Sequence, residues 1–585
     1  MANHVLPSLR IAIGLSGGVD SAVAALLIRR CVRTSADVAA LRCFGSARAP
    51  PPALKDLQAA VTEEKPLLSM LPDSVRREVC VAACGHRQHH LQVSYAPFFM
   101  NNWHDHDTPH GWCVRSLSDY DDAQRVARTL HLIPRTTSLP VLDFAEEYAE
   151  QCFQRMLNAY AAGHTLNVDV LCNVKIKFGA AAQKLKVTQD GPQQTLLATG
   201  HYARTWGVQR SRGPTLGHAA LLLQPCSAGH DLNDQTHFLA RVPPSVLAGA
   251  LFPIGHLFYA KADVRALARH SFSVHADLAH IAKKQTSTGI CFVGCPPPSP
   301  LSATAGNSGV TAEKASSAAR STPPSCNARF AGFLNEFLRP PLLSSPLPHR
   351  TVFRDATTNT ERELISGAST FSQLHDDYPT YLPAYAVTLG QRLRLTDAHD
   401  GGKGRAQNYY VARKRCLPAL SSSETHEVRL LAEVLVVDRW DHPLLFASRV
   451  GAVGLRWWLP TDVLRRASCC PDGTRYSFAC LCALRHQMLP QPAVIRWERE
   501  SEVEVLGKGE AAGSLRVRSC IVCFDAPVRA PASGQAVVVY APLPEVVKLL
   551  GLPDTEAQAA TPISLSSAMA VIGSGWVAAA SDDDV

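Results

Sequence analysis

The stretch IAIGLSGGVDSAVAALLI, residues 11–28, decides the fold at the start of this chain. An apolar run from Ile11 leads into the polar segment 16–21, and an Ala- and Leu-rich run follows to Ile28. This order predicts a strand, a tight loop and a helix. Two adjacent glycines, Gly17 and Gly18, allow positive φ and close approach of the backbone to a ligand. A plain strand-to-helix turn is the competing interpretation.

The loop has the features of an anion site. The N–H groups at the start of the following helix have no partners within the helix, and the helix dipole favours a phosphate there. Ser16 and Ser21 add hydroxyl donors. The Lys of a Walker-type loop is absent, and Asp20 stands in the loop instead. Because an acid repels phosphate unless a cation intervenes, Asp20 predicts Mg²⁺ bound together with pyrophosphate.

Length and composition restrict the class of protein. With 585 residues, 46% of them hydrophobic, the chain can bury several cores, which favours about two to four domains. The formal net charge of +8 is compatible with nucleic acid without deciding for it. No apolar run approaches the roughly 20 residues of a membrane span, so we expect an intracellular protein with no membrane partner. The 18 scattered cysteines predict mostly reduced thiols.

The N-terminal half alternates strand and helix patterns. Residues 91–103 (LQVSYAPFFMNNW) indicate a second strand, and residues 119–134 and 143–163 carry apolar positions at helical spacing. This alternation predicts an α/β domain with a parallel sheet over residues 1–297. Residues 31–90 are rich in Ala, Pro and Arg without a sustained period, so we interpret them as an insertion.

The remaining chain divides by composition. Residues 298–325 are rich in Pro, Ser, Ala and Thr, which predicts a disordered linker. We expect a small central domain over residues 326–408, beginning with an amphipathic helix. Short strand patterns such as SLRVRSCIVCFD (514–525) and GQAVVVYA (534–541) predict a β-rich, barrel-like domain over residues 409–585.

Two cysteines lie in polar turns next to lysines. Lys175 and Lys177 follow Cys172, whereas Lys283 and Lys284 precede Cys291. Nearby cations favour the thiolate, so the two thiols are candidates for a nucleophile and its resolving partner. Two ordinary buried cysteines explain the same spacing equally well.

These motifs resemble those of the tRNA-specific 2-thiouridylases, members of the ATP-pyrophosphatase (PP-loop) superfamily. The matching stretches run along most of the chain. They are SGGVDS (16–21), FMNNWHD (99–105), NVDVLCNVKIKF (167–178), ATGHYAR (198–204), FPIGHL (252–257), STGICFVG (287–294), TLGQR (388–392), SGQAVVVYA (533–541) and VIGSGWV (571–577). The resemblance implies a PP-loop domain, a tRNA-binding central domain and a C-terminal β-barrel-like domain.

The resemblance also implies an activity. The chain is expected to thiolate the wobble uridine in the anticodon of a tRNA, using ATP and Mg²⁺, forming AMP and pyrophosphate, and taking persulfide sulfur from a sulfur-relay protein or a cysteine desulfurase. Cys172 is implied as nucleophile or resolving cysteine, Cys291 as persulfide carrier and Asp169 as a catalytic residue that manages protons. The residues implied for ATP are Gly14, Leu15, Ser16, Gly17, Gly18, Val19, Asp20, Ser21, Met100 and Gly200. Those implied for tRNA are Asn167, Val168, His201, Asn233, Asp234, Gln235 and Gln535, with Asn167, Val168 and Asp169 around the target base.

The chain departs from the family pattern at three places. The family has Pro where Val168 stands, Lys where Asn233 stands, and an Arg-Tyr pair where this chain has Leu484 and Arg485. Two sulfur routes remain open. The persulfide attacks C2 directly and a Cys172–Cys291 disulfide follows, or Cys172 first releases sulfide, which then attacks.

Two other functions compete with tRNA thiolation. An amidating ATP-pyrophosphatase would keep the loop on a small adenylated acid but has no use for paired cysteines. An inactive tRNA-binding protein would have lost the loop or a cysteine segment, and both are intact. The leader MANHVLPSLR has Arg10 and no acid, and the low-complexity insertions are typical of eukaryotic proteins. We therefore expect a mitochondrial location, with the cytoplasm as the alternative.

Overall fold

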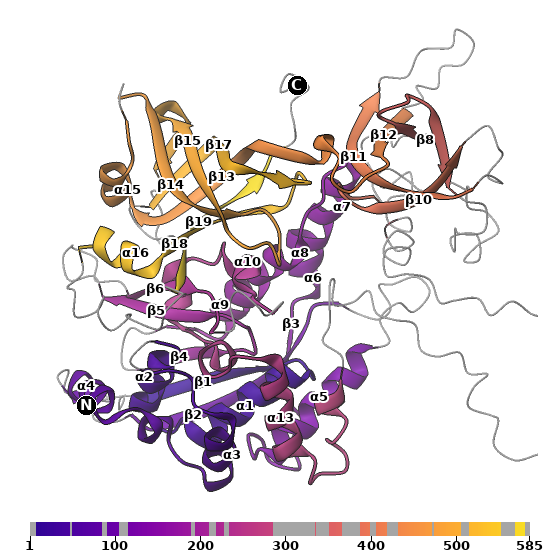
Figure 1. The fold of residues 1–585 in the computed structure, drawn as a ribbon. Coiled ribbons are helices and arrows are strands. Elements are labelled where there is room, and N and C mark those ends of the chain that lie inside the picture. Colours follow the sequence, from indigo (N-terminus) through magenta and orange to yellow (C-terminus); the bar gives the residue numbers. More distant parts are fainter. Residues whose placement is uncertain are drawn as a thin grey trace, which may run out of the picture.

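A computed structural model gives the fold of the chain, with a parallel α/β domain below and two β-rich units above it (Figure 1). The structure describes residues 8–46, 49–84, 91–103, 115–188, 193–209, 218–226, 233–284, 334, 350–364, 387–397, 405–417, 431–470, 473–504, 514–551 and 568–578. The predicted linker, most of the helix expected after it and the whole STGICFVG stretch with Cys291 lie outside these residues.

The N-terminal domain is built on the five-stranded sheet β3-β2-β1-β4-β7, in which all neighbours are parallel. Its strands are β1 (Ser8–Leu15), β2 (Val93–Asn101), β3 (Val141–Asp143), β4 (Gln193–Ala198) and β7 (Ala250–Leu251). β1 lies in the middle, and its apolar side chains Ile11 and Ile13 are fully covered. The predicted parallel sheet is confirmed. Because β1 is flanked on both sides, the loop that follows it is held at the carboxyl edge of the sheet.

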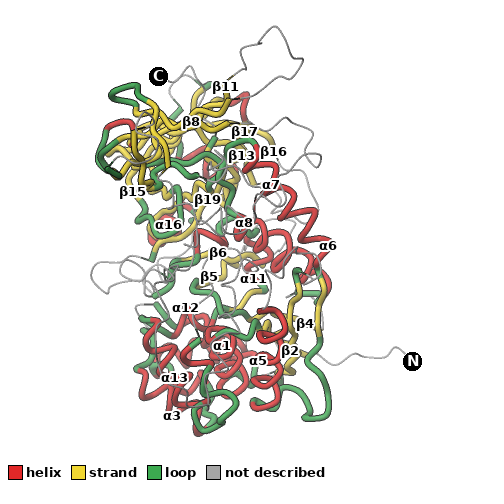
Figure 2. The backbone as a smooth tube through the Cα atoms, turned by 90° about the vertical axis from the view of Figure 1, so that its right-hand side faces the viewer, coloured by secondary structure: helices red, strands yellow, loops and turns green. Residues whose placement is uncertain are grey.

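Helices of the same domain pack around α1 (Val19–Cys31), which is buried along most of its length. It contacts α3 (Leu54–Glu63) and α13 (Lys261–Phe272), and α5 (Arg115–Thr129) lies beside them (Figures 1 and 2). α1 therefore carries the loop at its amino end into the interior of the domain.

The described part of the segment 31–90, which we interpret as an insertion, is largely helical. It forms α2 (Ser35–Cys43), α3, a 3₁₀ turn at Leu67–Met70 and α4 (Asp73–Cys84). Phe44, Leu57 and Leu67 belong to the same core as Ile11. These helices are short, so no apolar period is sustained over the segment, which explains why the sequence did not predict them.

A middle layer connects the parallel sheet with the β-rich part (Figure 1). It contains α6 (Ala145–Tyr148), α7 (Gln154–Ala161), α8 (Val168–Leu171), a π-helical stretch at Cys172–Ala180, α9 (Ala181–Lys184), α10 (Thr236–Leu239), α11 (Pro244–Ala248) and the hairpin β5 (Arg204–Gln209) and β6 (His218–Leu223). The short helix α12 (Pro253–Leu257) instead packs against α1 and α2 in the N-terminal domain. One apolar core joins Phe98 of β2, Val170 of α8 and Tyr540 from the C-terminal part, so the layers are packed together.

The C-terminal sheet has nine strands, two of which are β5 and β6. The others are β13 (Phe446–Pro460), β14 (Arg475–Ala483), β15 (Gln491–Glu498), β16 (Glu502–Glu504), β17 (Ser514–Arg529), β18 (Ala536–Pro542) and β19 (Met569–Val577). An additional pairing of β13 with β19 closes the sheet into a barrel, as predicted for this part of the chain. Because β6 pairs with β19, the strands β5 and β6 extend the C-terminal sheet, although the sequence predicts that they belong to the domain 1–297.

A smaller closed barrel has the strand order β10-β11-β12-β8-β9. Its strands are β8 (Arg350–Asp355), β9 (Glu361–Leu364), β10 (Arg392–Asp397), β11 (Gln407–Leu417) and β12 (Leu431–Val437). The domain boundary expected at residue 408 falls inside β11. The barrel needs β11 and β12 to close, so it continues to Val437. Two short helices, α15 (Thr461–Ala467) and α16 (Leu543–Leu549), accompany the larger barrel.

Candidate active site

The loop 16–18 joins β1 to α1 in the order that the sequence predicts. Gly17 has a φ of +71°, and Gly18 is the N-cap residue of α1 without a side-chain cap. Ser21 spans the loop, since its hydroxyl accepts from the Ser16 N–H at 3.1 Å and donates to the Gly18 carbonyl at 3.0 Å. The amino end of α1 is thus left without a side-chain acceptor, which suits an anion.

Residues from three strand ends meet at this edge of the sheet. Leu15 ends β1, Met100 is the next-to-last residue of β2, and Gly200 lies two residues after the end of β4. A Cβ on Gly200 would lie 2.7 Å from the Asp20 carbonyl carbon and from the Ser21 nitrogen. The backbone at Gly200 therefore touches the loop, and only glycine fits. Gly14 lies within β1, where a Cβ would be 3.5 Å from the Phe98 ring.

Asp20 has a protein cation as its partner. The Lys261 ammonium pairs with both oxygens of its carboxylate, and the Tyr202 hydroxyl donates to Oδ1 at 2.8 Å. Sequence reasoning missed Lys261, which lies at the start of α13. The described part of the chain holds no group of three or more His, Cys, Asp or Glu side chains arranged for a metal ion. One carboxylate already bound to an ammonium does not form a magnesium site, so the interpretation of Asp20 as a Mg²⁺ ligand does not fit this arrangement.

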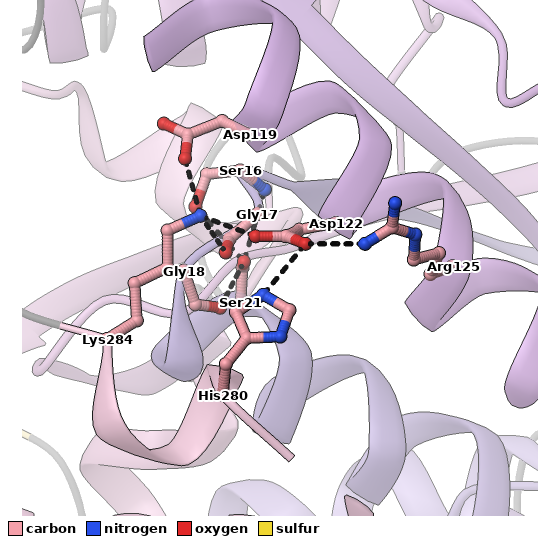
Figure 3. Close-up of polar contacts among 9 residues, drawn as sticks. All are labelled: Ser16, Gly17, Gly18, Ser21, Asp119, Asp122, Arg125, His280 and Lys284. Atoms are coloured by element: carbon pink, nitrogen blue, oxygen red, sulfur yellow. Dashed lines mark hydrogen bonds and ion pairs between the residues drawn. The ribbon is translucent and has the colours of Figure 1, made fainter. Parts of the chain in front are cut away.

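A second lysine, Lys284, links the loop to α5 (Figure 3). The Lys284 ammonium donates to the Gly17 carbonyl at 3.1 Å, to Asp119 Oδ1 at 2.6 Å and to Asp122 Oδ2 at 2.8 Å. Burial acts to lower the pKa of Lys284, but its bonds to the two carboxylates outweigh burial and hold that pKa above the ordinary value. His280 Nε2 lies 2.9 Å from the other oxygen of Asp122. Lys284 is therefore a charged, fixed neighbour of the loop.

A pocket of about 520 Å³ lies beside this cluster. It is lined by Ser118, Asp121, Asp122, Arg125, His280, Lys283 and Lys284. None of the residues predicted to bind ATP is among them.

The Cys172 segment begins with a capped helical turn. Asn167 is the N-cap residue of α8, and its Oδ1 accepts from the Asp169 N–H at 3.0 Å. Asp169 and Cys172 are three residues apart in helical structure and so lie on the same side. Asn102, which directly follows β2, places its Nδ2 3.9 Å from Cys172 Sγ. Sequence reasoning did not assign Asn102, although it stands in the FMNNWHD motif.

Cys172 is buried among aromatic and aliphatic side chains that include Trp103 and Phe153. Burial raises the pKa of its thiol to about 12, and the charge of Lys177 opposes this only in part. The expectation that the neighbouring lysines favour a thiolate here is therefore wrong for the free chain, because desolvation outweighs the attraction. Burial also raises the pKa of the Asp169 carboxyl, which makes it better able to hold a proton.

Several residues predicted to touch tRNA make internal hydrogen bonds. Asp234 accepts from the Thr236 N–H and hydroxyl and from Gln224, and Gln235 accepts from the Tyr202 N–H at 3.0 Å. The remaining members of the set lie around the same layer. Val168 is buried, His201 Nδ1 is 2.8 Å from the Thr199 hydroxyl, and Asn233 precedes α10.

Gln535 links the larger barrel to the segment in front of Cys172. Its Nε2 donates to the Thr165 carbonyl at 2.6 Å, and the Thr165 N–H donates to the Ser533 carbonyl at 2.8 Å. His164 Nδ1 lies 2.9 Å from the Ser533 hydroxyl. The C-terminal barrel thus positions the loop that leads into Asn167.

Comparison with known proteins agrees with this architecture. A family model described as the tRNA methyl transferase HUP domain matches residues 78–295. The tRNA-specific 2-thiouridylase MnmA of Chlamydia abortus is 28% identical over 444 residues, covering 76% of this chain and 85% of that protein. The enzyme of the same name from Bacillus subtilis is 28% identical over 445 residues, covering 76% and 84%. The chain is therefore similar to tRNA-specific 2-thiouridylases over about three quarters of its length.

A further relative has a higher identity over a shorter stretch. The MnmA of Chlamydia trachomatis serovar D is 38% identical over 197 residues, which cover 34% of this chain and 46% of that protein. The resemblance inferred from the sequence motifs is confirmed. Among the described helices, none is long and apolar enough to cross a membrane.

Proposed function

We propose that the chain is an ATP-dependent tRNA sulfurtransferase that replaces the C2 oxygen of the wobble uridine by sulfur. The observation that carries the proposal is that the loop after β1 and the Cys172 thiol lie at the same edge of the parallel sheet. The phosphate-binding loop follows β1, and Asn102 at the end of the neighbouring strand β2 contacts the Cys172 sulfur. The names of the relatives support the thiolation of tRNA.

Activation of the uridine is the proposed role of the loop. The C2 oxygen of uridine is a poor leaving group. After transfer of AMP to this oxygen, it can leave as part of AMP, which is a good leaving group. Pyrophosphate leaves, and the N–H groups at the amino end of α1 stabilise its charge. Met100 and Gly200 would lie on the adenosine side. Mg²⁺ is expected to accompany ATP, but Asp20 paired with Lys261 does not provide a site for it.

Delivery of sulfur is the proposed role of the two cysteines. A donor protein, either a sulfur-relay protein or a cysteine desulfurase, loads Cys291 as a persulfide. The terminal sulfur replaces the AMP-bearing oxygen at C2, directly or after release as sulfide, and AMP leaves. In both routes Cys172 and Cys291 end as a disulfide, which a dithiol must reduce before the next turnover. Asp169, with a raised pKa, would manage the protons of the thiol or the base.

Recognition of the tRNA is assigned to the residues implied by the family. Asn167, Val168 and Asp169 would surround the base, and the uridine has to leave its stack to reach the buried Cys172. His201, Asn233, Asp234, Gln235 and Gln535 would act from the middle layer and the larger barrel. The smaller barrel, at 350–437, would hold the tRNA as the central domain.

The decisive experiment supplies unmodified tRNA, ATP, Mg²⁺ and a persulfide donor, and measures nucleosides by mass. Sulfur in place of oxygen at the wobble uridine supports the proposal, and a tRNA of unchanged mass refutes it. A Cys291→Ser variant should release pyrophosphate without forming 2-thiouridine. A Cys172→Ser variant should keep a persulfide on Cys291 without turnover. Persulfide on Cys172 in the Cys291→Ser protein would reverse the two roles.

The mitochondrial matrix is the proposed location, with the cytoplasm as the alternative. A tagged full-length chain that remains in the cytosol, while cytosolic tRNA carries the 2-thio group, would contradict it.

A further inference from the structure

We propose that Lys284 is a positioning residue that fixes the orientation of the Gly17–Gly18 peptide, so that the Gly18 N–H faces the bound phosphates. This inference rests on the proposed use of ATP. Lys284 reaches the loop from the end of a 3₁₀ turn at Ile281–Lys283, far from the loop in sequence. Figure 3 shows its ammonium between the loop and α5.

The peptide between Gly17 and Gly18 has the fewest steric restrictions in the loop. Neither residue has a Cβ, so the peptide plane can rotate at low cost, and the loop alone does not select one orientation. Gly17 holds a φ of +71° in the structure. Some interaction outside the loop is therefore needed to keep its donors preorganised for an anion.

Lys284 supplies that interaction, because its Nζ donates a hydrogen bond to the Gly17 carbonyl oxygen, with 3.1 Å between the two atoms. In a trans peptide the C=O and the following N–H point in opposite directions. A carbonyl held toward Lys284 therefore turns the Gly18 N–H away from Lys284 and α5. Gly18 caps α1, so this N–H belongs to the amino end that attracts phosphate.

Lys284 is itself fixed by α5. Asp119 Oδ1 and Asp122 Oδ2 accept from its ammonium at 2.6 and 2.8 Å. The backbone of α5 touches the same glycine, because a Cβ on Gly17 would lie 2.3 Å from the Asp119 carbonyl oxygen. The ammonium also neutralises two carboxylates that would otherwise repel an anion in the loop.

The test measures ATP affinity directly, by calorimetry on the full chain without tRNA. Lys284→Met should weaken ATP binding by about tenfold or more, because an ordered donor is lost. Lys284→Arg, which keeps a cation with several donors, should recover most of the affinity. Lys55→Met, on the exposed face of α3, is the matched control and should bind as the wild type does. Unchanged affinity in Lys284→Met would overturn the proposal.

A second set of variants separates orientation from charge. Lys284→Met combined with Asp119→Asn and Asp122→Asn removes the ammonium together with both carboxylates. Affinity that stays low supports the orienting role, whereas full recovery would show that Lys284 only neutralises the acids. Should Lys284→Met fail to fold, Asp119→Asn alone should still weaken ATP binding, and wild-type affinity there would contradict the proposal. A wild type that binds no ATP would refute the proposed function itself.

Discussion

The Lys261 ammonium pairs with the Asp20 carboxylate, although 241 positions separate the two residues in the sequence. Tyr202 completes the arrangement, since its hydroxyl donates to Asp20 and the ammonium lies 5.0 Å from the centre of its ring. The only acid of the segment 16–21 is thus neutralised by the protein, which favours the proposed binding of phosphate at the amino end of α1.

Replacement of Lys261 should expose that acid. Lys261→Met leaves the Asp20 carboxylate uncompensated beside the phosphates, so we expect tRNA-dependent pyrophosphate release to fall roughly tenfold or more. Lys261→Arg keeps the charge and should lose much less. Pyrophosphate release from purified variants, at saturating tRNA and varied ATP, checks this. Equal rates in wild type and Lys261→Met would show that the pair has no part in the reaction.

Close packing at Gly200 should make that position intolerant of a side chain. Gly200→Ala places a methyl group 2.7 Å from backbone atoms of Asp20 and Ser21, and neither can move without shifting the loop. We expect a loss of about 1–3 kcal/mol in the free energy of unfolding and a loss of ATP binding. Gly207→Ala, where no atom lies within 4 Å of the added methyl group, is the control. Denaturant unfolding and calorimetry measure both effects, and a Gly200→Ala protein with normal ATP affinity would contradict the site.

The thiol of Cys172 should react slowly in the free protein. A thiol is neutral when protonated, so burial favours the protonated form and raises its pKa from 9.0 to about 12. At pH 8 this leaves roughly 1000-fold less thiolate than an unperturbed thiol has. Alkylation of Cys172 should therefore rise about tenfold per pH unit above pH 8, and lag far behind that of the exposed Cys469.

Peptide mass analysis after timed alkylation measures both thiols in one sample. Lys177→Met removes a charge that lowers the pKa of Cys172, so it should slow the reaction further. Fast alkylation of Cys172 at neutral pH would mean that the free chain opens this site.

The bond between Gln535 and Thr165 should matter for the tRNA step alone. Gln535→Ala removes the hydrogen bond of 2.6 Å to the Thr165 carbonyl and so frees the loop that leads into Asn167. We expect the free energy of unfolding to fall by about 1 kcal/mol. Thiolation should fall several-fold, while persulfide loading of Cys291 should remain unchanged. Gln193→Ala, at an exposed position of β4, should leave both unchanged. Single-turnover assays with preloaded protein distinguish the two steps, and a loading defect in Gln535→Ala would assign it a different role.

Much of the fold could be predicted from the local pattern of apolar residues and glycines along the sequence. The strand, loop and helix at 11–28, the strand at 91–103 and the short strands of the C-terminal part follow from apolar periodicity and from glycine. The helices of 31–90 were not predicted because the turns between them interrupt the apolar period, although Leu57, Ala60 and Val61 of α3 do have helical spacing. The boundary at 408 was misplaced for a different reason, since barrel closure depends on which strands pair and no local signal reports that.

By itself, the sequence determined the parallel α/β domain, the strand–loop–helix unit at 11–28, the β-rich C-terminal part and, through its motifs, the resemblance to the 2-thiouridylases. Only the tertiary structure decided the partners of Asp20, the place of Lys284 beside Gly17, the union of β5 and β6 with the C-terminal sheet and the protonated state of Cys172. These properties arise from groups that are distant in sequence and from the removal of water around them. Charge and pKa depend on what surrounds an atom in space, and neighbours along the chain are only a part of those surroundings.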